Sequence, residues 1–363
     1  MELFKASNQW ATRPADESFN SLAELHAANV AYREASLVSP TTPYASLRAE
    51  AQDNEVVILG KKSIPAKLTH WAFGQLCARV KVPAGFLREQ PATLATQNLN
   101  WGLKRLSDGI ADDGDDRTAN LLIHKNGGMQ VHGFNSEKYS RIWNDDITNR
   151  LLELEAEHGW SPAPAAFDGK RGLYASAHDM FVFMVDNQRR IFEKSPGGGL
   201  SRGFFVENSL VGASKLRFTR FLYAFVCGNH IVWGAQDVVE LALRHVGSAN
   251  ERAMQELEVE VTKYLDSSPS DEEAMIASAK KRVIAATPSN VLDAIFGKKI
   301  PALTQKLLAD GQQKATEHAD WYGDPNTVWG MVNGITEVAR DFAYADRRVE
   351  VERAASKLLT MEF

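Results

Sequence analysis

The chain has 363 residues, a formal net charge of -5 and a hydrophobic share of 44%. This length exceeds the roughly 250 to 300 residues that one hydrophobic core supports, so we expect two or three substructures. The acidic balance excludes a general attraction to polyanions, and the sequence shows neither a secretion signal nor an apolar run near the ~20 residues that span a bilayer, so we expect a cytoplasmic protein without membrane contact.

The first predicted region covers residues 1–107. Residues 21–35 follow helical spacing and predict an amphipathic helix. Val56 to Leu59 predict a strand that turns at Gly60, and a helical period begins at Thr69. Residues 72–91 have the texture of a helix-turn-helix, but the second helix is short and carries one arginine, which favours a plain helical hairpin.

An acidic segment, Asp108 to Arg117, predicts a joint before a central domain at 117–249. The stretch "NLLIHKNGGMQVHGF" then predicts a β-hairpin that turns within Asn126 to Gly128. His124 and His132 flank this turn, and a pair of histidines can bind a metal ion. A two-residue turn sends them to opposite faces of the hairpin, and only a three-residue loop aligns them diagonally, so we expect no metal there.

The rest of the chain completes the predicted fold. Residues 144–158 predict a helix with Asn144 or Asp145 as its cap and Gly159 as its stop. "GLYASAHDMFVFMVD" is an apolar run of strand length, and residues 250–363 are helix-like and charged. We therefore expect an α+β fold: a central mixed or antiparallel sheet with packed helices, an N-terminal helical and strand segment, and a mostly helical C-terminal region.

The two cysteines, Cys77 and Cys227, lie in apolar surroundings and favour reduced core thiols. A helix that begins near Ser214 is predicted by the i, i+3, i+4, i+7 spacing of Phe218, Phe221, Leu222 and Phe225. Cys227 falls in its last turn, where packing is favoured over zinc because no second cysteine pair exists. The sequence predicts no metal and no cofactor.

Basic and aromatic residues alternate in "SKLRFTRFLYAF". Cations hold phosphates and aromatic rings stack on unpaired bases, a combination that binds single-stranded nucleic acid. The alternative is an amphipathic helix with a phenylalanine face in the core and a solvated basic face. The residues predicted to bind single-stranded DNA are Lys125, Arg202, Phe204, Phe205, Lys215, Arg217, Arg220 and Tyr223.

No phosphate-binding loop and no nucleophile elbow is present, so the expected protein is not an enzyme. The alternative is a metal-dependent nuclease, because imidazole and carboxylate groups bind divalent cations. The residues of this alternative are His178, Asp179, Glu207 and His230. Exposed strand ends often carry such residues without any catalytic role.

Several stretches resemble a phage/plasmid-like family catalogued as domain of unknown function 932, among them "NQWATRPADESFNSL", "AKLTHWAFGQLCARVKVPAGFL", "EKYSRIWNDDI" and "RGFFVENSLVGASKLRFTRFLYAFVCGNHIVWGA". The resemblance spans nearly the whole chain, and "VCGNHIVWG" with "WGMVNGITE" is its most specific part. The family has no agreed activity, so the resemblance implies a habitat in phages, plasmids and other mobile elements and transfers no catalytic residue.

That habitat favours an accessory protein of replication or recombination. The expected function is therefore the binding or annealing of single-stranded DNA, with a homo-oligomer as one form that such proteins take. Two alternatives stay open, the metal-dependent nuclease and a protein-binding modulator of host machinery that uses the charged C-terminal helices.

Overall fold

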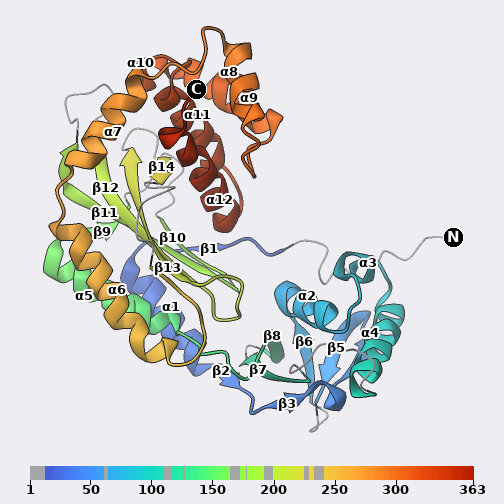
Figure 1. The fold of residues 1–363 in the computed structure, drawn as a ribbon. Coiled ribbons are helices and arrows are strands. Elements are labelled where there is room, and N and C mark those ends of the chain that lie inside the picture. The colour runs from blue at the N-terminus through green and yellow to red at the C-terminus, as the bar shows by residue number, and fades with distance from the viewer. Residues whose placement is uncertain are drawn as a thin grey trace.

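The computed structural model builds the chain around two separate β-sheets that helices cover (Figure 1). It describes residues 13–60, 64–108, 117–125, 127–163, 172–176, 178–191, 199–224, 229–232 and 241–363. The predicted α+β class is confirmed. None of the described helices is long and apolar enough to cross a membrane.

The larger sheet is central and antiparallel. Its strands run in the order β1-β10-β11-β12-β13-β14, while β9 pairs with β11 and β15 with β13. They are β1 (Glu17–Ser18), β9 (Trp160–Pro162), β10 (Leu173–Ala175), β11 (Met180–Ile191), β12 (Leu200–Asn208), β13 (Leu216–Ala224), β14 (Asn229–Val232) and β15 (Leu241–Leu243).

Both faces of the central sheet are buried. One face packs against the helices α1 (Leu22–Glu34), α5 (Asn144–His158) and α6 (Ala249–Asp266), and the other packs against α12 (Ala345–Ser356). Phe204 belongs to the first face and Phe205 to the second, because neighbouring side chains of a strand point to opposite sides. As a result, every residue of β12 is buried.

The predicted helix near Ser214 is wrong. Residues 216–224 form β13, which pairs with β12 along its length. A sheet that is covered on both faces loses the apolar-polar alternation of an ordinary strand, and a nearly continuous apolar run can match helical spacing by chance. The proposed end of that helix, with Cys227, lies outside the described residues.

The smaller sheet is formed by β2 (Ser36–Val38), β3 (Thr42–Pro43), β4 (Arg48–Gln52), β5 (Glu55–Leu59), β6 (Pro65–Leu68), β7 (Thr118–Lys125) and β8 (Met129–Asn135). The order is β2-β7-β8-β6-β5-β4, and only the β6–β8 pair is parallel. One face carries α2 (His70–Arg79), α3 (Ala84–Arg88), α4 (Ala92–Ser107) and the short 3-10 helix η2 (Tyr44–Ser46). The short α2–α3 pair agrees with the helical hairpin favoured above.

This smaller sheet is inserted between α1 and α5, two helices that contact each other in the central body. Strands β7 and β8, which follow the predicted joint, therefore lie in the same sheet as β2 to β6 (Figure 1). The division into 1–107, 117–249 and 250–363 stays a prediction.

The predicted hairpin has a loop of three residues, since Lys125 pairs with Met129 and His124 with Gln130. His132 consequently lies diagonal to His124 on the same face, and their ring centroids are 5.2 Å apart. The expectation that these histidines face opposite sides is wrong, because it depended on a two-residue turn.

The C-terminal region is mostly helical, as predicted. After α6 it comprises α7 (Ser270–Lys281), α8 (Pro288–Gly297), α9 (Gln305–Glu317), α10 (Ala319–Tyr322), α11 (Val328–Arg340), α12 and the 3-10 helix η3 (Lys357–Thr360). Threonines cap α8, α9 and α11 with their hydroxyl groups, which fixes where these helices begin.

The two ends of helix α5 can be compared with the cap and stop residues predicted from the sequence. It stops at Gly159, whose φ of 71° is left-handed, as expected. Its cap, however, is Trp143, with no side-chain capping hydrogen bond, so neither Asn144 nor Asp145 is the cap. The side-chain amide of Asn208 donates to the side-chain oxygen Oδ1 of Asn144 instead, and Asn144 is buried.

Candidate metal centre

The turn between β10 and β11 presents two polar side chains, His178 and Asp179, in the middle of an apolar run. The Ser176 hydroxyl holds this turn, since it donates to the Asp179 carboxylate at 2.5 Å and accepts from the Asp179 backbone N–H at 3.1 Å. The run that the sequence offers as one strand is therefore two strands, and the site lies where they separate.

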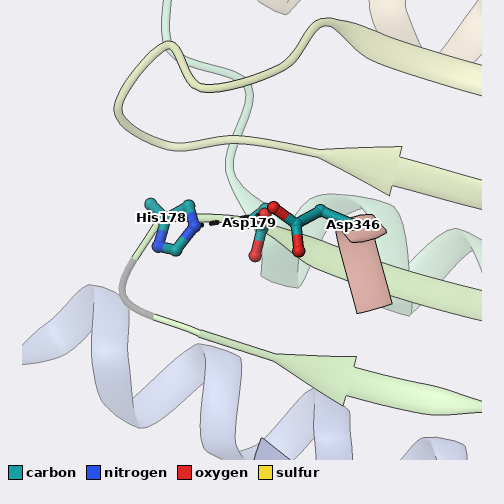
Figure 2. Close-up of side chains that lie close together, drawn as sticks. All are labelled: His178, Asp179 and Asp346. Atoms are coloured by element: carbon teal, nitrogen blue, oxygen red, sulfur yellow. Dashed lines mark ion pairs between the residues drawn. The ribbon is translucent and has the colours of Figure 1, made fainter. Parts of the chain in front are cut away.

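Helix α12 brings a third group, Asp346 in its first turn, to the same place (Figure 2). One ligand atom from each of His178, Asp179 and Asp346 lies within 4.8 Å of the other two. The His178 Nε2 and the Asp179 Oδ2 are 3.4 Å apart. An imidazole and two carboxylates form a donor set that suits a divalent ion such as Mn²⁺, Zn²⁺ or Fe²⁺.

Arg13 lies among three carboxylates at this site. Its guanidinium is 2.7 Å from Asp346, 3.1 Å from Asp16 and 3.7 Å from Asp179. Asp16 also accepts the backbone N–H of Ala345 at 2.7 Å, which ties it to the start of α12. Carboxyl groups outnumber the single guanidinium here, and this excess of acidic groups favours a divalent cation.

Burial controls the protonation of the cluster. It raises the pKa of Asp179, against the Ser176 hydrogen bond and Arg13, which lower it. Burial, together with the Arg13 charge, lowers the pKa of His178 to about 4, against the Asp346 and Asp16 carboxylates, which raise it. His178 also stacks on Trp71, with ring centroids 5.6 Å apart. The imidazole is therefore neutral at pH 7, the form that binds a metal ion.

A cavity of about 470 Å³ opens beside this cluster. Helix α2 contributes His70 and Trp71 to its wall, and the end of β12 contributes Glu207. Along α12 and into η3 the cavity meets a stripe of charged residues spaced three or four apart, Asp346, Glu350, Arg353 and Lys357. The central sheet, helix α2 and the C-terminal helices thus supply the walls.

Of the predicted nuclease residues, His178, Asp179 and Glu207 line this one cavity. Glu207 faces Arg353 at 3.1 Å and Arg217 at 3.5 Å, so its charge is balanced and it stands outside the ligand cluster. The backbone of His230 lies in β14 opposite Tyr223, and its side chain lies outside the described part of the chain.

Sequence reasoning missed Arg13, Asp16, His70 and Asp346. Asp346 stands in a helix of alternating charges, "ADRRVEVER", and nothing local separates it from its solvated neighbours. Arg13 and Asp16 lie next to residues 1–12, which are outside the described residues.

The residues predicted to bind single-stranded DNA do not form one surface. Phe204 and Phe205 have 0% exposure and Tyr223 has 2%, so these rings cannot stack on a base in this structure. Arg202 is buried as well and donates to the backbone oxygens of Ser267 and Tyr264.

The other predicted cations are separated too. Arg220 lies over the Tyr264 ring on the α6 side of the sheet, whereas Arg217 faces Glu207 on the α12 side. Lys125 is exposed at the end of the smaller sheet, and Lys215 is partly exposed before β13. Binding of single-stranded DNA stays a prediction, but an interface built from this set contradicts the packing.

Cys77 is a core thiol, as predicted. It is fully buried among α2, α4 and the smaller sheet, and burial raises the pKa of its thiol to about 12. Such a thiol is protonated and unreactive at neutral pH.

The model of the family described as "Domain of unknown function (DUF932)" matches residues 131–358. The chain belongs to this family. The match covers His178, Asp179, Glu207 and Asp346, and it excludes Arg13 and α2 of this DUF932 protein. No curated protein and no solved structure matches the chain. Membership in DUF932 therefore identifies related proteins but no activity, which has to be inferred from the site.

Proposed function

We propose that this DUF932 protein is a divalent-metal-dependent hydrolase of phosphate esters. The observation that carries the proposal is the convergence of His178, Asp179 and Asp346 within 4.8 Å of one another beside a cavity. These three side chains come from two distant parts of the sequence. A neutral imidazole and two carboxylates are a donor set that suits a divalent ion.

The residues of the chain have separate tasks in this proposal. His178, Asp179 and Asp346 hold the ion, and Ser176 and Trp71 hold the first two in place. A bound divalent ion supplies Lewis acidity and a water of lowered pKa. Arg13 and Asp16 anchor Asp346 and the start of α12, so the ligand geometry is fixed before any ion arrives.

A phosphate ester suits the cavity because cations lie beyond the ligand cluster. Arg353 follows Asp346 by seven residues on α12, about 10 Å along the helix axis. Lys357 is exposed on the same wall, and no ion pair joins it to a carboxylate of the described residues. The positive charge of Lys357 attracts an anionic group of the substrate at one end of the cavity, while the ligand cluster at the other end binds the reacting phosphate.

The test combines metal binding with turnover. Isothermal titration with Mn²⁺ should give one site in the wild type and no binding in Asp346→Asn. The control Asp310→Asn, at a partly exposed aspartate on α9, should bind as the wild type does. Hydrolysis of bis(4-nitrophenyl) phosphate should depend on Mn²⁺ and stop with EDTA. Absence of Mn²⁺ binding in the folded wild type would end the proposal.

The function expected from the sequence, binding or annealing of single-stranded DNA, stays untested. The habitat in phages and plasmids, a role in recombination and a homo-oligomeric form likewise remain predictions.

A further inference from the structure

Three neighbouring cavities share wall residues, and together we call them the trough. The first, of about 470 Å³, shares Arg13, His70, Trp71 and His178 with a second of about 370 Å³. The second shares Ala15, Gln130 and Ser176 with a third of about 340 Å³. Cavities of this size each hold one small-molecule-sized unit, such as one nucleotide. A row of three that begins at the ligand cluster therefore indicates an extended substrate.

One wall of the trough is the polar face of the smaller sheet, the face opposite α2 and α4. Lys67 of β6 pairs with Gln130 of β8, which pairs with His124 of β7, so the three side chains form a straight row across the strands. Neighbouring strands lie about 4.8 Å apart, and the row therefore extends about 10 Å. Lys67 and Gln130 line the second cavity, and Gln130 and His124 line the third.

The groups at the far end of the trough are polar and aromatic, and most carry no charge. The rings of Tyr32 and His124 stack with centroids 4.5 Å apart. The Tyr32 hydroxyl lies 2.7 Å from Nδ1 of His132, whose Nε2 lies 3.0 Å from the Gln130 side-chain oxygen. These contacts hold the rings and the Gln130 amide in fixed positions. Flat rings and amide groups are what a protein uses to stack on unpaired bases and to bind their edges.

The trough is charged at the end near the metal ligands, which suits phosphates, and nearly neutral further along, which suits bases. Metal ligands and the exposed cation Lys357 line the first cavity, where phosphates would lie, and Arg353 is paired there with Glu207. Further along, Lys67 is paired with Glu55 at 2.5 Å, which leaves that section close to neutral. A duplex hides the Watson–Crick edges and the stacked faces of its bases and is too wide for cavities that each hold one unit, so an unpaired strand is favoured.

We propose that the trough binds one unpaired nucleic-acid strand, with its reacting phosphate at His178, Asp179 and Asp346 and its neighbouring bases against the row Lys67, Gln130 and His124. This inference rests on the proposed function for the reacting phosphate. The binding of bases is separate, because it uses a different sheet and needs no metal ion.

The experiment measures strand binding apart from hydrolysis. Fluorescence anisotropy in EDTA at low salt compares a labelled 12-nucleotide oligo(dT) or oligo(dA) with a 12-base-pair duplex. The wild type should bind the single strands at least tenfold more tightly than the duplex. His124→Ala and Gln130→Ala should each weaken strand binding about tenfold. The matched controls His158→Ala and Gln313→Ala, both exposed and outside the trough, should bind as the wild type does.

Two further measurements distinguish a loss of strand binding from a loss of folding. Each variant is checked by thermal melting, and ultraviolet cross-linking of the wild type to a 5-bromouridine strand gives a second measurement that should place the cross-link on Tyr32, His124 or Trp71. Equal binding by trough and control variants, preference for duplex, or displacement of the strand by an uncharged extended peptide would overturn the inference. Mn²⁺-dependent hydrolysis of the small ester together with any of these results would leave the proposed function standing. Strand binding without Mn²⁺ binding would overturn the proposed function and the placement of the reacting phosphate, and would leave the binding of bases along the trough standing.

Discussion

Arg13 donates a hydrogen bond to Asp346 at 2.7 Å although the two residues are 333 positions apart in the sequence. The Arg13 guanidinium also lies 4.5 Å from the centre of the Tyr344 ring, and the Tyr344 hydroxyl donates to the Arg13 carbonyl oxygen at 2.7 Å. These contacts join the segment before β1 to the start of α12 beside the candidate metal centre.

Loss of the Arg13 charge should destabilise the protein and increase its response to metal. In Arg13→Gln, the carboxylates of Asp16, Asp179 and Asp346 repel one another without a guanidinium between them. We expect the free energy of unfolding in EDTA to fall by about 2 kcal/mol. Mn²⁺ should recover most of this loss in urea unfolding. The ion pair of Arg252 with Glu256 on the surface provides the control. Arg252→Gln should lower the free energy of unfolding by under about 1 kcal/mol with or without Mn²⁺.

Removal of the Lys357 ammonium should weaken substrate binding with little effect on the chemical step. Lys357 lines the first cavity beyond the metal ligands, so its charge attracts the bound substrate and the transition state equally. For Lys357→Ala we expect KM for the phosphate ester to rise several-fold at low salt with kcat unchanged. Lys306→Ala on α9 should leave both constants unchanged. A fall in kcat with constant KM would contradict this role.

His245 should make the protein less stable in mild acid. It is 4% exposed and stacks on Tyr139, and burial lowers its pKa to about 4 against a weaker opposing contact with the Ser140 backbone. The unfolded imidazole takes up a proton near pH 6.5, so this contribution to stability is present above pH 6.5 and is lost as the pH falls towards 4. At 1.36 kcal/mol per pH unit the loss amounts to about 3 kcal/mol.

His245→Phe tests this origin, because phenylalanine keeps the stacked ring and has no titrating nitrogen. Neither ring nitrogen of His245 makes a well-formed hydrogen bond to the described residues. The variant should therefore be about 1 kcal/mol more stable at pH 7 and should lose less stability between pH 6.5 and 4. Urea unfolding across that range gives the comparison, and an unchanged pH slope would assign the acid sensitivity to other groups such as His178.

Gly334 should tolerate no side chain. A Cβ at Gly334 would lie 2.0 Å from the Gly311 carbonyl oxygen, because α11 and α9 cross with their backbones in contact. Gly334→Ala should cost about 3 kcal/mol or more, or prevent folding. Gly297→Ala is the matched control, since nothing lies within 4 Å of its added Cβ, and it should be neutral or slightly stabilising. Equal stability of both variants would show that the two helices separate easily.

The same geometry explains part of the resemblance noted in the sequence. "WGMVNGITE" lies in α11, and a Cβ at Gly330 would meet the Asp324 carbonyl oxygen at 2.5 Å. The spacing of its glycines therefore serves helix packing, and a motif can be specific to a family without touching a substrate.

Local signals were enough to predict elements whose environment is ordinary. α5 ends at Gly159 and the C-terminal region is helical as its periodicity indicates. β13 was predicted wrongly because Phe218 and Phe221 pack on opposite faces of a doubly covered sheet, where strand alternation disappears.

The candidate site was predictable only in part for a related reason. His178, Asp179 and Glu207 stand out because polar groups at strand ends interrupt apolar runs. Asp346 and Arg13 join them through tertiary packing alone, and one sequence gives no measure of which distant charges meet. The side-by-side position of His124 and His132 depended on a single residue of loop length.

The long separation of Arg13 and Asp346 has a consequence during synthesis. A ribosome translates His178 and Asp179 long before it reaches α12, so an emerging polypeptide holds two of the three candidate ligands and lacks the third. Interrupted translation products and fragments cut ahead of α12 should therefore not bind Mn²⁺ at this site.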